Sequence, residues 1–147
     1  MKIGIGSDHG GLELKEKVKK HLMSRDIEVV DFGTHTPDSV DYPDMAKPVC
    51  EAVLENEVDC GILFCGTGIG ISIAANKHKG IRAALCSDVY SAKMTKVHNN
   101  ANVICLGGRV TGRELAFMIV DAWLNAEFEG GRHEQRIAKI HKIEEEQ

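Results

Sequence analysis

A cysteine followed by a glycine-rich turn is the stretch of this chain with the clearest chemical potential. Cys65 follows the apolar run 61–64 and precedes Gly66-Thr67-Gly68-Ile69-Gly70, after which the segment 71–76 has helical character. A buried strand that ends in such a turn surrounds a small space with free backbone N–H groups and the positive end of a helix dipole. Such a space attracts anions and favours the thiolate form of a cysteine. The stretch is therefore a candidate oxyanion site with Cys65 as its nucleophile or base.

The spacing of these glycines excludes two common nucleotide sites. The pattern is G-x-G-x-G rather than the dinucleotide fingerprint G-x-G-x-x-G, and no acidic residue is placed to bind a ribose hydroxyl. A P-loop is excluded because its Lys-Ser/Thr pair is missing. The hydroxyl of Ser72 and the amides of residues 66–70 can still hold an oxyanion. The alternative is a tight strand-to-helix packing turn, which needs only one or two of the three glycines.

Two other short stretches carry groups that exchange protons. Asp8-His9 follows the apolar run 2–6 and is either an acid–base pair or a helix cap. His98-Asn99-Asn100 ends a helical run just before another apolar run. A histidine at that place either takes part in chemistry or pairs as a cation with the helix dipole.

Arginines with the spacing of a phosphate site lie near the C-terminus. Arg132 and Arg136 are four residues apart and share one face of an amphipathic helix, and guanidinium groups suit phosphate. The alternative is a solvated charged helix in which Arg136 pairs with a nearby glutamate. The apolar stripe of this helix predicts packing across a neighbouring subunit; it consists of Ile137, Ile140 and Ile143.

Five apolar runs alternate with helical runs along the chain, which predicts repeated βα units and an α/β fold. We expect a five-stranded, parallel, Rossmann-like sheet between two layers of helices, an α/β/α sandwich. The strands are expected near residues 2–6, 27–31, 60–65, 81–86 and 102–106. Ligands of such sheets bind beyond the carboxyl ends of the strands. Arg109 follows the last strand and is expected at this edge of the sheet. Tyr42 belongs to the long loop 34–43 and either covers a ligand or simply lies on the surface.

Length and composition exclude several classes of protein. The 147 residues form one domain, 1–147, and the net charge of −4 argues against nucleic-acid binding. No apolar run has membrane length, and the strand-like start at Lys2 leaves no room for a signal peptide, so we expect a cytoplasmic protein. The five cysteines are odd in number and form no C-x-x-C pair, which argues against a disulfide framework and against zinc. We expect no metal and no cofactor.

The candidate groups together indicate one class of reaction. A thiolate base, two histidines, a cluster of amides and an arginine pair suit the removal of a proton from carbon next to a carbonyl, with an oxyanion to be stabilised and a phosphate to be bound. Isomerisation of an aldose phosphate to a ketose phosphate has all three features. The partner is then a small molecule.

The whole chain also resembles a known family, the type-B ribose-5-phosphate isomerases within the wider ribose/galactose isomerase group. The stretches that carry the resemblance are Gly6–Gly11, Asp31–Thr34, Asp41–Pro43, Cys65–Lys77, His98–Val103 and Gly130–His133. The resemblance implies a homodimer that can pair into tetramers. It also implies interconversion of D-ribose 5-phosphate and D-ribulose 5-phosphate, the pentose phosphate pathway reaction, without a metal or organic cofactor.

The resemblance assigns roles residue by residue. Cys65 matches the base that abstracts a proton from carbon, and the backbone of 66–70 matches the hole that holds a cis-enediolate. His98 matches the acid that opens the furanose ring, with Asp8 as its acid–base partner, and Asn99 matches a contact to the sugar. The remaining matches bind phosphate and other parts of the substrate, some of them from the second subunit: His9, Arg109, Arg132 and Arg136.

One branch of the family uses a glutamate just after the third glycine as its base, and Ile71 stands there in this chain. Cys65 is therefore the expected base. Two alternatives remain open. The protein can act on a six-carbon sugar phosphate such as allose 6-phosphate or galactose 6-phosphate, or it can be a non-catalytic sugar-phosphate sensor in which Cys65 is inert.

Overall fold

The computed structural model describes residues 1–147 and contains the predicted alternation of strands and helices. The strands are β1 (Lys2–Ser7), β2 (Glu28–Asp31), β3 (Cys60–Cys65), β4 (Ala83–Leu85) and β5 (Val103–Gly107). The helices are α1 (Leu12–Met23), α2 (Tyr42–Leu54), α3 (Ile69–Ala75), α4 (Val89–Asn99), α5 (Arg113–Asn125) and α6 (Arg132–Glu145).

The five strands form one parallel sheet in the order β2-β1-β3-β5-β4, as the sequence predicts. The chain moves from β1 to one side of the sheet for β2 and to the other side for β3. The strand order therefore reverses between β1 and β3, and in open α/β sheets the crevice beyond such a reversal binds ligands. The residues that follow β1 and β3 are the Asp8 and Cys65 stretches.

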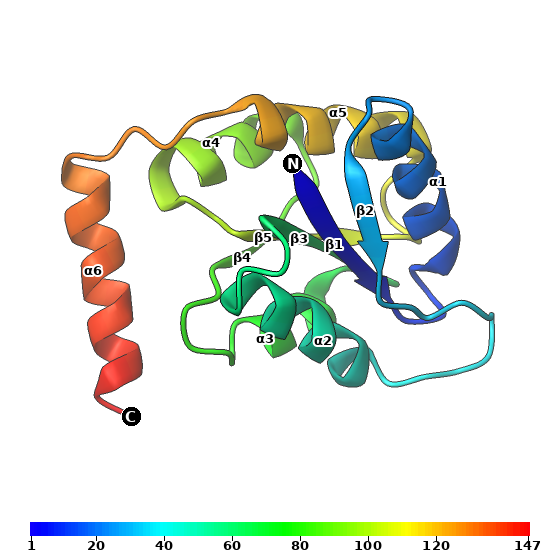
Figure 1. Cartoon of the computed structure of the whole chain (residues 1–147), viewed down its shortest axis with the longest axis horizontal. Helices are drawn as coiled ribbons and strands as arrows, with labels where there is room; N and C mark the ends of the chain where they lie inside the picture. The colour runs from blue at the N-terminus through cyan, green and yellow to red at the C-terminus, as the bar shows by residue number, and fades with distance from the viewer.

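Helices cover both faces of the sheet, so the predicted three-layer α/β/α architecture is confirmed (Figure 1). One buried core joins the sheet to α1, α4 and α5 and includes Trp123. The other joins it to α2 and α3 and includes Val49 and Ile71. Successive strand residues alternate between these cores because strand side chains point to opposite faces, as Ile62 and Leu63 do.

Two boundaries differ from the sequence prediction. β4 covers only three residues, because the N–H of Arg82 donates to the Asn102 side chain at 2.8 Å instead of to a neighbouring strand. α2 begins at Tyr42, within the segment 34–43 that is expected to be a loop, because Pro43 fits a first helical turn. Tyr42 is thereby held on a helix and not on the loop before it.

The C-terminal helix α6 stands apart from the sandwich and is reached by an extended segment after α5 (Figure 1). Only His133 and Ile137 of this helix are buried, whereas Ile140 and Ile143 are exposed by 41% and 58%. The predicted apolar stripe is thus present but largely uncovered within one chain. That it packs on a second subunit stays a prediction. None of the helices combines the length and the apolar character needed to span a bilayer.

Candidate active site

Three turns meet beyond the carboxyl ends of β1, β3 and β5. The N–H of Asp8 donates to the Phe64 carbonyl at 3.2 Å, which joins the first turn to β3. The N–H groups of Gly108 and Arg109 donate to the carbonyls of Cys65 and Gly66 at 2.8 and 2.9 Å. These backbone contacts bring the Asp8 stretch, the glycine-rich turn and the Arg109 turn to one place.

Cys65 ends β3, and the chain turns back over its thiol. Sγ accepts a hydrogen bond from the Gly68 N–H at 3.1 Å, and the side chain lies at the start of α3 with only 5% of the residue exposed. A backbone N–H that donates to sulfur stabilises the thiolate, and so does the positive end of a helix. This is the chemical environment that the sequence predicts for a basic thiol.

Four backbone N–H groups around the same turn donate to no atom of the chain, namely those of Gly66, Thr67, Gly70 and Ile71. The Ile69 N–H, by contrast, donates to Thr67 Oγ1 at 3.2 Å. Free N–H groups at a helix start are the usual donors for an anion. The turn can therefore supply donors to an oxyanion beside Cys65.

Glycine is needed at two positions, one in the turn and one at the end of β5, for different reasons. Gly68 has φ of +81°, a left-handed conformation, and a Cβ atom there would lie 2.6 Å from Leu85 Cδ1. A Cβ atom on Gly107 of β5 would lie 2.6 Å from the Thr67 carbonyl carbon. The turn and the end of β5 are thus in direct backbone contact. The glycines allow both the turn and this close approach.

Asp8 and His9 are both fixed by backbone donors. Asp8 Oδ1 accepts from the N–H groups of Gly10 and Gly11 at 2.9 and 3.1 Å, so it closes the turn before α1 and does not cap that helix, whose N-cap is Gly11. His9 Nδ1 accepts from the Val40 N–H at 3.2 Å. In the neutral ring Nε2 then carries the proton and is a donor.

Two side chains lie over the glycine turn. A Cβ atom added to Gly66 would lie 3.4 Å from Arg109 Nη1, and one added to Gly70 would lie 2.8 Å from the ring of Tyr42. Both side chains are exposed, Tyr42 by 40%. They therefore lie where a ligand held by the turn would be covered.

The hydroxyl of Ser72 does not face the oxyanion site. It donates to the Ile69 carbonyl at 2.7 Å, so its proton is used within α3. Serine hydroxyls in helices commonly bond back to the preceding turn in this way. The Ser72 hydroxyl is therefore not available to an oxyanion, whereas the four free N–H groups of the turn are.

A second cluster forms around His98, near the C-terminus of α4. Its ring stacks on His133 of α6 with centroids 4.5 Å apart, and Glu129 Oε1 lies 3.8 Å from His133 Nε2. Desolvation lowers the pKa of His133, and the neighbouring His98 lowers it further. Asn99 is the last residue of α4, and Arg132 and Arg136 lie in the first two turns of α6; all three are exposed.

Neither of these arginines forms an ion pair within the chain, so the alternative in which Arg136 pairs with a glutamate is not what the structure contains.

The two clusters lie at opposite edges of the sheet within one chain. Cys65 ends β3, whereas α4 returns the chain to the start of β5, where the Asn102 carbonyl accepts from the Gly61 N–H at 3.0 Å. A strand as long as β3 spans about 17 Å. His98 therefore lies away from the Cys65 turn within a single chain, because a helix that precedes a strand ends at the strand's amino edge.

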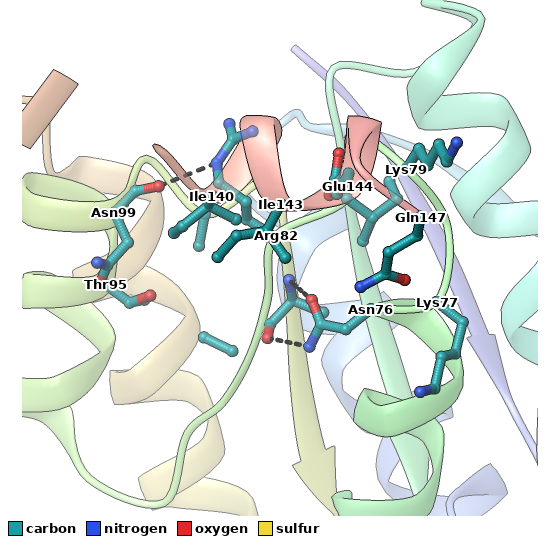
Figure 2. A pocket seen from close by; sticks show the side chains of 14 residues that line it. Asn76, Lys77, Lys79, Arg82, Thr95, Asn99, Ile140, Ile143, Glu144 and Gln147 are labelled. Atoms are coloured by element: carbon teal, nitrogen blue, oxygen red, sulfur yellow. Dashed lines mark hydrogen bonds between the residues drawn. The ribbon is translucent and has the colours of Figure 1, made fainter. Parts of the chain in front are cut away.

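A cavity on the α6 side lies away from Cys65. It has a volume of about 560 Å³ and lies between α6, β4 and the ends of α3 and α4 (Figure 2). Asn99 and Arg82 line it, and Cys65 does not. Arg82 donates from Nε to the Asn99 carbonyl at 3.0 Å and from Nη2 to the Asn100 carbonyl at 2.9 Å. Its Nη1 lies 3.1 Å from His141 Nε2 of α6, so Arg82 joins the end of α4 to α6.

Comparison with known proteins identifies the family of the chain over nearly its whole length. Residues 3–140 match the model of a family described as Ribose/Galactose Isomerase. The chain belongs to this family. Ribose-5-phosphate isomerase B of Escherichia coli is 55% identical over 144 residues, which cover 98% of this chain and 97% of the relative.

Two solved structures of relatives are very similar to this member of the ribose/galactose isomerase family. Ribose-5-phosphate isomerase B of Clostridium thermocellum superposes with a TM-score of 0.98 at 58% identity, with 99% of each chain covered. The enzyme of Mycoplasma genitalium, solved with bound ribulose-5-phosphate, superposes with a TM-score of 0.95 at 46% identity, covering 99% of this chain and 97% of that one.

Two further features of the structure are the burial of Ile71 and the contacts around His98. Ile71 is fully buried in the core on the α2 and α3 side, so the position after Gly70 offers no base. Glu129 and His133 join His98, a contact that sequence reasoning did not find. The spacing of Glu129 and His133, four residues apart, could have suggested their mutual contact, but it carries no information about α4.

Proposed function

We propose that the chain is an aldose–ketose isomerase that interconverts D-ribose 5-phosphate and D-ribulose 5-phosphate. The observation that carries the proposal is the Cys65 thiol, which accepts the Gly68 N–H at 3.1 Å beside four unpartnered amides. The names of the relatives and the sugar phosphate bound to the Mycoplasma genitalium enzyme support the choice of substrate.

The chemistry proposed for this site is a one-base proton shuttle. The Cys65 thiolate removes the proton from C2 of the open-chain aldose and returns it to C1. Negative charge develops on a substrate oxygen in the enediolate, and the free N–H groups of Gly66, Thr67, Gly70 and Ile71 are placed to hold it. Tyr42 and Arg109 cover the substrate on the solvent side.

Ring opening and phosphate binding are proposed for the second cluster together with residues of the first. His98 protonates the furanose ring oxygen while Asp8 takes the anomeric proton, and Asn99 contacts the sugar. Arg132 and Arg136, which are exposed and unpaired in the chain, bind the phosphate. Arg109 and His9 complete the polar contacts.

The two clusters can serve one substrate only if they come from two chains. Within one chain they lie at opposite edges of the sheet, about 17 Å apart along β3. We therefore propose a homodimer in which Cys65, Asp8 and the glycine turn face His98 and the arginines of α6 from the partner. The exposed Ile140 and Ile143, and the separation of α6 from the sandwich (Figure 1), support this assembly, which can pair further into tetramers.

We further propose that the protein works in the cytoplasm as one catalytic domain without a metal or organic cofactor. The five cysteines are all free, which is usual for proteins of a reducing compartment. The acid, the base and the oxyanion donors of the reaction are all present as protein groups.

The test follows turnover of ribose 5-phosphate in deuterium oxide. The wild-type protein should form ribulose 5-phosphate with deuterium at C1, because the thiol exchanges its proton with solvent. Cys65→Ala should lose about 10²–10⁴-fold in kcat. The matched control is Cys86→Ala, which removes another buried thiol on the opposite face of the sheet and should stay active.

Three outcomes are decisive. If wild-type protein gives neither turnover nor exchange but binds ribose 5-phosphate, it is a sensor and the proposed reaction is wrong. If Cys65→Ala stays fully active, the base is a different group. If allose 6-phosphate turns over with a higher kcat/KM than ribose 5-phosphate, the substrate is a six-carbon sugar phosphate.

A further inference from the structure

Three side chains that can bind metals converge where α4 meets α6. His98 comes from α4, His133 from the first turn of α6, and Glu129 from the segment before it. One donor atom of each lies within 4.8 Å of the other two. Two imidazoles and one carboxylate form a donor set that suits zinc and similar divalent transition ions.

His133 Nε2 is the second observation that points to a ligand. This atom is buried and has no hydrogen-bond partner, and only 5% of His133 is exposed. Buried polar atoms nearly always have a partner, so one without any marks a place where a group is missing. The carboxylate oxygen Glu129 Oε1 lies 3.8 Å away, which is too far for a hydrogen bond.

The backbone fixes two of the three residues. The Glu129 N–H donates to the Val97 carbonyl at 3.0 Å, which ties this segment to the turn of α4 that precedes His98. The His133 N–H donates to the Gly130 carbonyl at 3.1 Å. The three side chains therefore stay together although they come from three different segments.

We propose that His98, Glu129 and His133 bind one divalent transition ion of the zinc class, and that this ion inhibits the enzyme by occupying His98. Binding itself is independent of the proposed function, whereas inhibition rests on it. Hard ions such as Mg²⁺ and Ca²⁺ prefer oxygen ligands and should not bind here. The ion would leave one position for water or for a substrate oxygen.

Binding requires a small rearrangement. The two rings are stacked 19° from parallel, so their in-plane lone pairs do not yet point at one position. Rotation of the rings would bring the donor atoms to about 3.3 Å from one another, the separation around a tetrahedral zinc ion. Arg132 and Arg136 add positive charge nearby, so we expect weaker affinity than at a structural zinc site.

The first experiment measures binding by titration calorimetry of the full-length protein with zinc chloride. We expect one ion per chain for the wild type, and a loss of affinity of at least about tenfold in Glu129→Gln and His133→Asn. The matched controls change exposed residues of the same types, Glu127→Gln and His35→Asn, and should bind as the wild type does. No binding, or equal binding by Glu129→Gln, would overturn the proposal.

The second experiment excludes the thiols and tests inhibition. Cobalt(II) bound at this site should give visible absorption without the strong near-ultraviolet band of cobalt thiolates, and Cys65→Ala should give the same spectrum. Zinc should inhibit wild-type turnover of ribose 5-phosphate reversibly and inhibit Glu129→Gln much less. Zinc binding with no effect on an active enzyme would refute the inhibitory role, whereas zinc binding to a protein without turnover would instead refute the proposed function.

Discussion

At the scale of single residues, the candidate site depends on backbone groups more than on side chains. In the proposed reaction Cys65 is the only side chain of the glycine turn with a chemical role, and its thiol accepts a hydrogen bond from the Gly68 N–H. Burial raises the pKa of the Cys50 and Cys60 thiols to about 12, so these remain inert small apolar groups. What distinguishes Cys65 is therefore the turn that follows it.

The glycine at position 68 provides a direct test of this turn. Gly68→Ala forces an L side chain into φ of +81° and against Leu85, so the Gly68 N–H should move away from Cys65 Sγ. We expect a loss of about 1–3 kcal/mol in the free energy of unfolding and at least about tenfold in kcat. Gly112→Ala, where nothing lies within 4 Å of the added carbon, should change both little. Steady-state kinetics and urea unfolding measure the two effects, and an active Gly68→Ala variant would show that the turn geometry is unimportant.

At the scale of elements, a buried lysine joins α1 to β2 and to the loop that carries His35. Lys15 Nζ lies 2.6 Å from Asp31 Oδ1 and 2.8 Å from the Thr34 carbonyl, and the side chain is fully buried. Burial alone would raise the pKa of Asp31, but hydrogen bonds from Lys15 and the Gly33 N–H outweigh it and hold that pKa below its usual value. This ion pair fixes the start of the loop whose Val40 N–H binds His9.

Removal of this lysine has a consequence that depends on pH. Lys15→Met should cost about 3 kcal/mol of unfolding free energy at neutral pH, because it leaves Asp31 buried with only Lys19 as a cation. A carboxyl with a lowered pKa stabilises the fold above its unfolded value near 3.9 and loses that contribution as pH falls through the folded value. The difference between wild type and variant should therefore shrink below about pH 4 in urea titrations.

Lys17→Met is the control for this change, since Lys17 is only partly buried on the same helix and pairs only with Glu13. It should alter the unfolding free energy by less than about 1 kcal/mol at any pH. A Lys15→Met protein as stable as the wild type at neutral pH would mean that the buried ion pair does not stabilise the fold.

The sequence predicted most elements but not the partners of every candidate residue. The spacing of apolar residues and the positions of the glycines located the five strands and the Cys65 turn, because both depend only on residues that are close in the sequence. The role of Lys15 was not predicted, since nothing local to residue 15 indicates that it is buried against Asp31. Likewise, His133 contacts His98 only because the segment after α5 crosses back to α4, with the Glu129 N–H on the Val97 carbonyl.

At the scale of the whole molecule, one chain holds two separate clusters of candidate residues, which we propose to be two half-sites. The Cys65 turn lies at the carboxyl edge of the sheet, and His98 lies at the end of α4 that leads to the amino edge. The helix that carries the two arginines, α6, stands apart from the sandwich (Figure 1). A dimer in which each chain contributes one half to each site explains this separation, the exposed Ile140 and Ile143, and the lack of ion pairs on Arg132 and Arg136.

Complementation between two inactive variants tests this shared site most directly. Cys65→Ala and His98→Asn should each be inactive alone, and a mixed dimer would carry one site with both changes and one with neither. Equal amounts, unfolded and refolded together, should therefore recover about a quarter of wild-type turnover of ribose 5-phosphate, because half of the dimers are mixed and each has one intact site of two. A mixture that forms mixed dimers by size and mass measurement yet stays inactive would contradict the account, because each site would then be built within a single chain.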